Sequence, residues 1–319
     1  MLDINFKKFE NLSGKDLYSR IFSEIGAQNK NVLMLGSDAI KSNGGGEFIG
    51  RFPERTFDFG IAEANMVAAG AGLAKLNKIP LVGMYGFLVL RTAEQIRNDV
   101  CYQNLNVKLF GTHIGVSMAA EGVTHHGVND ISILRSFPNI TIIQPASPKE
   151  AVAAIFTAVL DYNGPVYLRM PDTLCEGLYD DTYYFKIGKA YTLQDGKDVT
   201  IIASGAMISI AKDAANQLTS EGISVRLINT PTIKPMDEDA IIKAAKETKG
   251  IITIEDNDLA GGLGAEVSQI VCDNYPTKVK MFGLPKDRFT VIAPSAKDIF
   301  DYFGIHVEGI KKAVKEILS

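Results

Sequence analysis

The feature that most constrains this fold is the alternation of short apolar runs, rich in Val and Ile, with longer segments of helical period. Such runs are typical of parallel strands buried on both faces, and the segments between them supply crossover helices. The apolar runs occupy residues 32–36, 56–60, 80–86, 107–113, 140–145, 165–170, 199–204, 225–230, 250–256 and 279–285. The helical segments occupy residues 62–76, 92–103, 148–161, 207–222, 236–248 and 264–275. We therefore expect an α/β fold in which two doubly wound sheets follow one another.

The change from the first unit to the second is expected where this alternation breaks down. Residues 170–185 lose strand and helix periodicity and gather Pro, Gly and Asp. A chain of 319 residues is also near the practical limit of a single core. We expect two domains, at residues 1–175 and 176–319, with the boundary region between Asp172 and Lys186.

Composition excludes several classes of protein. The formal charge of −4 gives no basic surface for nucleic acid. The longest apolar stretch, residues 79–90, contains Pro80 and two glycines and falls short of the roughly 20 residues that span a bilayer. The first residues mix both charges, unlike a signal peptide, so we expect a cytoplasmic protein. The three cysteines form no CxxC pair and support neither a zinc knuckle nor a disulfide framework.

Polar side chains gather after the apolar runs of the first unit. They are Ser37, Asp38, Ser42 and Asn43 after residues 32–36, Glu63 after 56–60, His113 with Glu121, His125 and His126 after the fourth run, and Arg169 in the sixth. Taken singly, Asp38 reads as a turn residue, Glu63 as a carboxylate at a helix start, and Arg169 as half of an ion pair. Ligands of open α/β sheets bind beyond the carboxyl ends of the strands, so convergence there favours a site.

The segment GTHIGVSMAAEGVTHHG, residues 111–127, holds three of the four histidines around a single acid. Imidazoles and a carboxylate are plausible zinc ligands. Adjacent residues such as His125 and His126 rarely point to one metal, however, so we predict no metal site in this chain.

Four motifs give the chain a family resemblance. TFDFGIAEANM and GTHIGVSMAAEGVTHH, with LGSDAIKSN and VYLRMPD, resemble the C-terminal half of transketolase, and specifically the separate C-terminal subunit of split transketolases. The resemblance covers essentially the whole chain. It implies a pyrimidine-binding domain followed by a transketolase C-terminal domain, and a transferase that moves a two-carbon ketol unit between sugar phosphates or related anionic sugars.

The resemblance also implies roles for individual residues. Glu63, His113 and His125 are the expected catalytic residues, with Glu63 also contacting the aminopyrimidine of thiamine diphosphate. A carboxylate on that ring stabilises its imino tautomer, and a histidine moves a hydroxyl proton as the carbon–carbon bond breaks. The other expected cofactor contacts are Phe87, Leu90 and Asp38. The expected substrate contacts are Glu121, Arg169, Ser42, Lys15 and His126.

One part of the family pattern is missing from these residues. The family holds the cofactor's diphosphate and Mg²⁺ with a GDG motif followed by an asparagine, and no GDG occurs in this sequence. The resemblance therefore implies that an N-terminal transketolase subunit supplies the diphosphate and metal site. A heterotetramer with two copies of each chain is the expected symmetric assembly.

Several positions depart from the family pattern, and they concern the substrate. Glu121 and His126 stand where aspartate and glutamine are usual, Ala120 replaces a common acid, and Ala93 replaces an expected tyrosine beside the aliphatic Leu90. A sulfonated sugar, a branched sugar phosphate and a pentose phosphate all stay open as substrates.

Three rival interpretations also stay open. The chain could be half of another thiamine enzyme, such as a deoxyxylulose-phosphate synthase or a 2-oxoacid dehydrogenase β subunit. It could be a non-catalytic partner subunit. It could also bind a nucleotide at Gly261, Gly262 and Gly264, where a glycine-rich turn precedes a helical segment.

Overall fold

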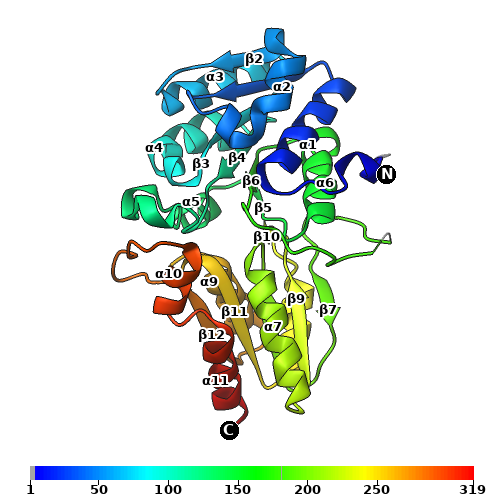
Figure 1. Ribbon diagram of the computed structural model, residues 1–319, viewed down its shortest axis with the longest axis vertical. Coiled ribbons are helices and arrows are strands. Elements are labelled where there is room, and N and C mark those ends of the chain that lie inside the picture. The colour runs from blue at the N-terminus through cyan, green and yellow to red at the C-terminus, as the bar shows by residue number, and fades with distance from the viewer. Residues whose placement is uncertain (1–3, 181) are drawn as a thin grey trace.

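A computed structural model describes residues 4–180 and 182–319. Within these residues the N-terminal half, together with β10 from the C-terminal half, builds a seven-stranded sheet in the order β10-β5-β6-β4-β3-β1-β2 (Figure 1). Its strands are β1 Val32–Gly36, β2 Thr56–Asp58, β3 Ile79–Tyr85, β4 Lys108–Thr112, β5 Thr141–Ile143, β6 Val166–Arg169 and β10 Thr232–Lys234. Its helices are α1 Gly14–Gln28, α2 Gly46–Arg51, α3 Glu63–Lys75, α4 Val89–Gln95, α5 Asp130–Arg135 and α6 Pro148–Phe156. All strand pairs except that of β10 are parallel.

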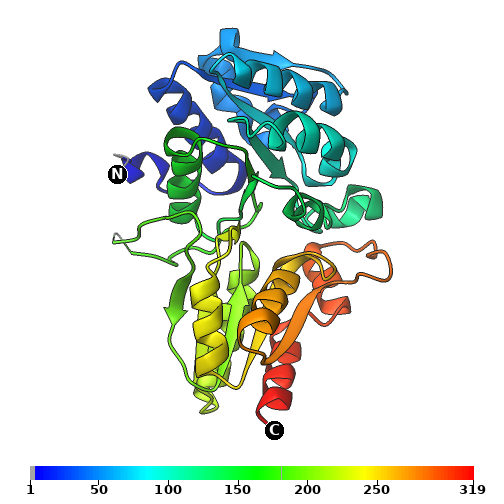
Figure 2. The ribbon, with the colours of Figure 1, turned by 180° about the vertical axis from the view of Figure 1, so that it is seen from behind.

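The C-terminal half builds a second sheet, with five strands among the described residues in the order β12-β11-β8-β9-β7. The strands are β7 Tyr191–Gln194, β8 Val199–Ala203, β9 Val225–Asn229, β11 Gly250–Asp258 and β12 Lys278–Leu284. The helices are α7 Met207–Ser220, α8 Glu238–Glu247, α9 Leu263–Asn274, α10 Ala296–Tyr302 and α11 Val307–Leu318. In both views the two halves are stacked along the long axis of the molecule (Figures 1 and 2).

The observed architecture confirms the expected class of two α/β units with largely parallel sheets. The apolar runs became the parallel strands, and β1 and β4 are buried at every residue. Two antiparallel strands were not predicted. The three-residue β10 belongs to the C-terminal half by sequence, yet it pairs with β5 of the first sheet. The proposed boundary at residues 175 and 176 falls in the connection between β6 and β7.

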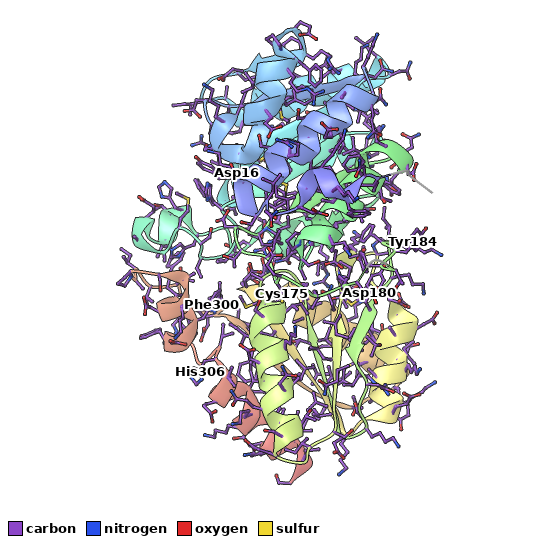
Figure 3. The ribbon with its side chains drawn as sticks, turned by 45° about the vertical axis from the view of Figure 1, so that its right-hand side comes forward. Asp16, Cys175, Asp180, Tyr184, Phe300 and His306 are labelled. Carbon is purple, nitrogen blue, oxygen red and sulfur yellow. The ribbon has the colours of Figure 1, made fainter. Side chains whose placement is uncertain are left out.

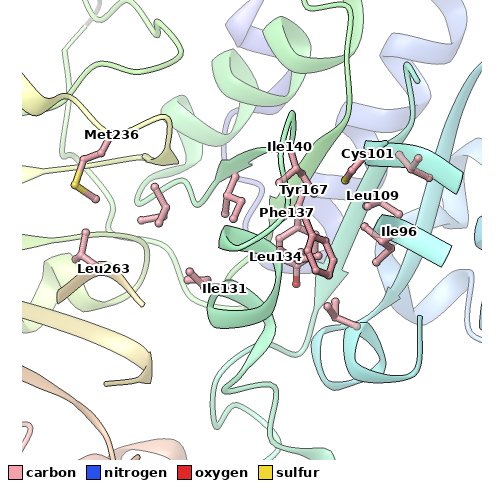
Figure 4. Close-up of a cluster of buried hydrophobic side chains, with 14 of the residues drawn as sticks. Ile96, Cys101, Leu109, Ile131, Leu134, Phe137, Ile140, Tyr167, Met236 and Leu263 are labelled. Carbon is pink, nitrogen blue, oxygen red and sulfur yellow. The ribbon is translucent and has the colours of Figure 1, made fainter. Parts of the chain in front are cut away.

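One hydrophobic cluster joins the two halves. Tyr167 of β6 and Leu134 of α5 pack in it together with Met236 and Leu263 from the C-terminal half (Figure 4). Burial of apolar surface in a continuous cluster favours one relative placement of the two sheets. The carboxyl edge of the first sheet is therefore positioned against the second unit. No helix within 4–180 and 182–319 is long and apolar enough to cross a bilayer.

Candidate active site

The carboxyl ends of β1, β3, β4 and β6 meet at one edge of the first sheet because these strands are parallel neighbours. Ser42 follows β1, Tyr85 ends β3, His113 follows β4 and Asp172 follows β6. The structure joins them in a row. The Ser42 Oγ lies 2.9 Å from the Tyr85 hydroxyl, the Tyr85 ring centroid lies 4.8 Å from that of His113, and His113 Nδ1 lies 3.3 Å from Asp172 Oδ2. The convergence expected at this edge is thus present in the fold.

His113 sits in an unusual backbone conformation. Its φ of 49° lies in the left-handed region, which residues other than glycine seldom adopt. The turn directs the imidazole against the Tyr85 ring, and the ring remains 30% exposed. Strained conformations of this kind persist where the surrounding structure holds them, and they cluster at functional sites.

The second catalytic candidate, His125, lies next to Phe87. The two ring centroids are 4.9 Å apart, and the Thr124 hydroxyl lies 3.0 Å from His125 Nδ1. Phe87 in turn lies 5.9 Å from Tyr85, so both histidines border the same pair of aromatic rings. Glu121 is exposed at the end of the short 3₁₀ turn Ala119–Glu121.

The start of α1 borders this row of side chains. A Cβ atom on Gly14 would lie 3.0 Å from the backbone oxygen of Asp172, so the helix begins against that residue. Lys15 follows in the first turn and is exposed. Asp38 is exposed beyond β1 and donates its backbone N–H to Asp58 Oδ1 at 3.0 Å.

Glu63 forms a separate group on the same edge. It is the first residue of α3 and only 3% exposed, with the Arg91 guanidinium donating to its Oε2 at 3.0 Å and the Ser37 hydroxyl lying 3.4 Å from its Oε1. A helix N-terminus favours a carboxylate, and Arg91 compensates its charge. Two apolar side chains are left uncovered: Ile61, two residues before Glu63, is 76% exposed, and Leu90, next to Arg91, is 54% exposed. A buried carboxylate beside open apolar surface suits an aromatic ring that carries a hydrogen-bonding nitrogen.

Arg169 was expected to contact the substrate, but the fold buries it away from the open site. It is fully buried and donates to Asp130 Oδ2 at 2.8 Å, to the Asp256 carboxylate, and to the Gly127 carbonyl at 3.2 Å. Burial alone lowers the pKa of Arg169, but Asp130 and Asp256 outweigh it and raise that pKa above its usual range. A substrate phosphate has no open path to this guanidinium. Arg169 instead ties the histidine-bearing segment, at Gly127, to the C-terminal half.

His126 also differs from its expected role as a substrate contact. It is 3% exposed, and its Nδ1 lies 2.6 Å from the hydroxyl of Thr290 in the C-terminal half. Burial lowers the pKa of His126 and so favours the neutral ring. The Ala293 N–H donates to the Ala119 carbonyl at 3.3 Å, so the loop before α10 contacts the histidine-bearing segment.

The glycines at 261–264 have a structural explanation without a nucleotide. The Glu255 carboxylate accepts the backbone N–H groups of Leu263 at 2.8 Å and Gly264 at 2.9 Å, at the start of α9. A Cβ on Gly262 would lie 1.7 Å from Glu255 Oε2. The chain's own carboxylate therefore occupies the position that a phosphate would take. Burial raises the pKa of Glu255 to about 8.

A cavity of about 790 Å³ lies between the two halves, behind the histidine-bearing segment. Its walls include Ile114 and Asp172 from the first half and Asp213, Phe300 and His306 from the second. Figure 3 shows Phe300 and His306 on one side of the C-terminal half. Glu63, His113 and His125 do not line this cavity, but Asp172, which contacts His113, does, so the cavity adjoins the site at the sheet edge.

Three residues at the site were missed from sequence alone. Tyr85 and Asp172 stand at the ends of predicted strands, so the rule that selected Ser42 and His113 could have found them. The same rule could not select Arg91, because Arg91 lies within α4 and not at the end of a strand, and it contacts Glu63 only in the folded chain. Within the described residues, no group of three or more His, Cys, Asp and Glu side chains could hold a metal ion.

Models of two protein-family domains match this chain. The transketolase pyrimidine binding domain matches residues 10–176, and the transketolase C-terminal domain matches residues 188–310. The chain belongs to the transketolase family. Transketolases are transferases, and membership implies dependence on thiamine diphosphate.

Individual transketolase relatives match over nearly their whole length. The chain is 37% identical to one subunit of the apulose-4-phosphate transketolase of Phocaeicola vulgatus, over 93% of this chain and 94% of the relative. It is 32% identical to a 6-deoxy-6-sulfo-D-fructose transketolase subunit of Clostridium sp., over 95% and 94%. A solved structure described as a split gene transketolase, inactive beta4 tetramer, is 31% identical, with a TM-score of 0.87 over 96% of this chain and 99% of that one.

Proposed function

We propose that this chain is the C-terminal subunit of a thiamine-diphosphate-dependent transketolase. It transfers a two-carbon ketol unit between sugar phosphates or related anionic sugars, together with an N-terminal subunit that holds the diphosphate and Mg²⁺. The observation that carries the proposal is the buried Glu63 carboxylate on the same sheet edge as the exposed faces of His113 and His125.

Glu63 is suited to hold the aminopyrimidine of the cofactor. When bound, thiamine diphosphate supplies the carbanion that attacks a ketose carbonyl. The Glu63 carboxylate would accept a hydrogen bond from the ring, and Phe87, Leu90 and Ile61 would supply apolar contacts to it. Arg91 is 56% exposed on its side chain, so it can turn away from Glu63 as the ring docks.

The histidines act on the sugar. His113 and His125 border the aromatic pair from two sides, and each takes or returns a hydroxyl proton while the carbon–carbon bond breaks or forms. Glu121 accepts a hydrogen bond from a further hydroxyl. We assign Ser42 and Lys15 to the anionic end of the substrate, and Asp38 to the cofactor. Arg169 and His126 support the segment that carries the histidines.

The need for a partner is supported by the relatives. Two are named as subunits, and a solved relative composed of beta chains is described as inactive. We propose a heterotetramer with two copies of each chain. The sugars named for the two relatives differ, one a branched sugar phosphate and one a sulfonated sugar. Both carry an anionic end, which suits the exposed ammonium of Lys15.

The substitution Glu63→Gln tests this function. The amide keeps the size of the side chain but removes the charge, so we expect ketol transfer by the reconstituted pair to fall at least about 100-fold. Glu94→Gln is the matched control, because Glu94 is exposed on α4 and should leave the rate unchanged. Full activity of the Glu63 variant would remove Glu63 from the mechanism.

A further inference from the structure

Asp172 has no role in the proposed reaction, yet it contacts a catalytic candidate. It is the third residue after β6, and its Oδ2 lies 3.3 Å from Nδ1 of His113. The contact joins residues 59 positions apart in sequence, so it is made by the fold rather than by local chain geometry. The side chain of Asp172 is 42% exposed, so its carboxylate stays in contact with water.

The backbone on each side of this contact is held independently. The buried Tyr18 hydroxyl of α1 donates to the Pro171 carbonyl at 2.8 Å, and Gly14 packs against the Asp172 carbonyl. On the other side, the left-handed turn at His113 and the Tyr85 ring fix the imidazole. The two groups therefore meet because both anchors are rigid.

We propose that Asp172 is a positioning residue for His113. Its carboxylate accepts the Nδ1–H of the neutral imidazole and so selects the tautomer in which Nε2 carries a free lone pair. The tautomer is a property of this chain alone. Its use in catalysis rests on the proposed function, in which a substrate hydroxyl gives its proton to Nε2 and the imidazolium then faces the Asp172 carboxylate.

This arrangement also explains which face of His113 meets the substrate. Nδ1 points to Asp172 and the ring edge meets Tyr85, with an interplanar angle of 73°. Nε2 is the remaining polar atom of the ring. A carboxylate that orients an imidazole keeps it from turning and stabilises its protonated form during the reaction.

The experiment uses the full chain labelled with ¹⁵N-histidine and long-range ¹H–¹⁵N spectra at a pH where His113 is neutral. The four histidines are separated by recording His113→Gln, whose spectrum lacks one signal set. We expect His113 in the Nδ1–H form in the parent chain and a shift toward the Nε2–H form in Asp172→Ala. Asp213→Ala is the matched control, because Asp213 lines the same cavity without a contact to His113. It should leave the His113 signals in place.

An Nε2–H form in the parent, or the same tautomer in parent and Asp172→Ala, would overturn the proposal. Asp172→Asn preserves the shape of the side chain and serves as a second variant if the alanine variant does not fold. The weaker amide acceptor should give an intermediate tautomer ratio, and an unchanged ratio in a folded Asp172→Asn chain would count against the role.

Activity of the reconstituted pair gives a separate readout. We expect Asp172→Ala to lower kcat about 10- to 100-fold with little change in KM, because a displaced base reacts slowly while binding contacts remain. Asp172→Glu should recover part of the loss. If Glu63→Gln keeps full activity while the His113 tautomer still depends on Asp172, the proposed function fails and the positioning contact stands. If Glu63→Gln loses activity while the His113 tautomer does not depend on Asp172, the proposed function stands and only the positioning role of Asp172 is rejected.

Discussion

At the residue scale, the buried guanidinium of Arg169 shows how a polar residue at a strand end becomes structural. Two carboxylates from different halves, Asp130 and Asp256, surround it with no solvent access to the guanidinium. Asp256 also lies against Gly115, where a Cβ would come within 2.9 Å of its backbone and side-chain oxygens and φ is +58°. The network therefore holds the histidine-bearing segment, residues 111–127, at two points, Gly115 and Gly127.

Removal of this guanidinium should destabilise the folded chain. We expect Arg169→Ala to lower the free energy of unfolding by about 3–5 kcal/mol, because it leaves two buried carboxylates uncompensated. Urea unfolding of the isolated chain measures this. Arg97→Ala, which removes an exposed guanidinium on the same domain, should cost less than about 1 kcal/mol. Equal effects of the two substitutions would show that Arg169 is not bound in the network described.

Only part of the site could be predicted from single residues. The sheet-edge rule found Ser42 and His113 because it depends on local strand pattern alone. It could not separate an open arginine from a buried one, since Asp256 lies 87 positions from Arg169 and carries no sequence mark of the contact. The burial of His126 could not be predicted for the same reason, because its partner Thr290 lies 164 positions away.

At the scale of elements, the loop before α10 packs against the histidine-bearing segment. Thr290 contacts His126, and Ile292 lies within about 3 Å of the Cβ position of Gly122, whose φ is +81°.

The parallel strands were predictable because continuous burial requires apolar runs. The strands β7 and β10 were not, since Tyr191–Gln194 and Thr232–Lys234 contain no continuous apolar run of the kind that marks the parallel strands.

The buried imidazole in this contact makes stability depend on pH. Burial lowers the pKa of His126 below its ordinary value of 6.5, so the unfolded chain takes up the proton first as the pH falls. The stabilising contribution of the neutral ring is complete above about pH 6.5 and is lost as the pH falls from there toward the lower folded pKa.

His126→Gln should reduce this pH dependence, because glutamine preserves a polar side chain but does not titrate. We expect the fall in Tm between pH 7.5 and pH 5.5 to be smaller in the variant than in the parent. His306→Gln is the control, because His306 is less buried and caps α11 through its Nδ1. An identical fall in the parent and in His126→Gln would contradict the neutral buried imidazole.

At the scale of the whole molecule, the C-terminal half completes the site without contributing a predicted catalytic side chain. Asp256, Thr290 and Ala293 all hold the segment that carries His113 and His125. The fold class could be predicted because the alternation of strands and helices runs through the chain. The packing of one half on the other could not, since it depends on contacts such as Met236 with the shared cluster.

The central claim is that this chain contributes the aminopyrimidine and sugar-proton residues of an enzyme whose diphosphate and Mg²⁺ site lies on a second chain. The most direct measurement is ketol transfer on a panel of anionic ketoses by the chain alone and by the chain with its co-purified N-terminal subunit, each with and without Mg²⁺ and thiamine diphosphate. We predict activity only in the complete mixture. Ketol transfer by this chain alone, or a folded pair that transfers no ketol unit from any ketose, would contradict the account.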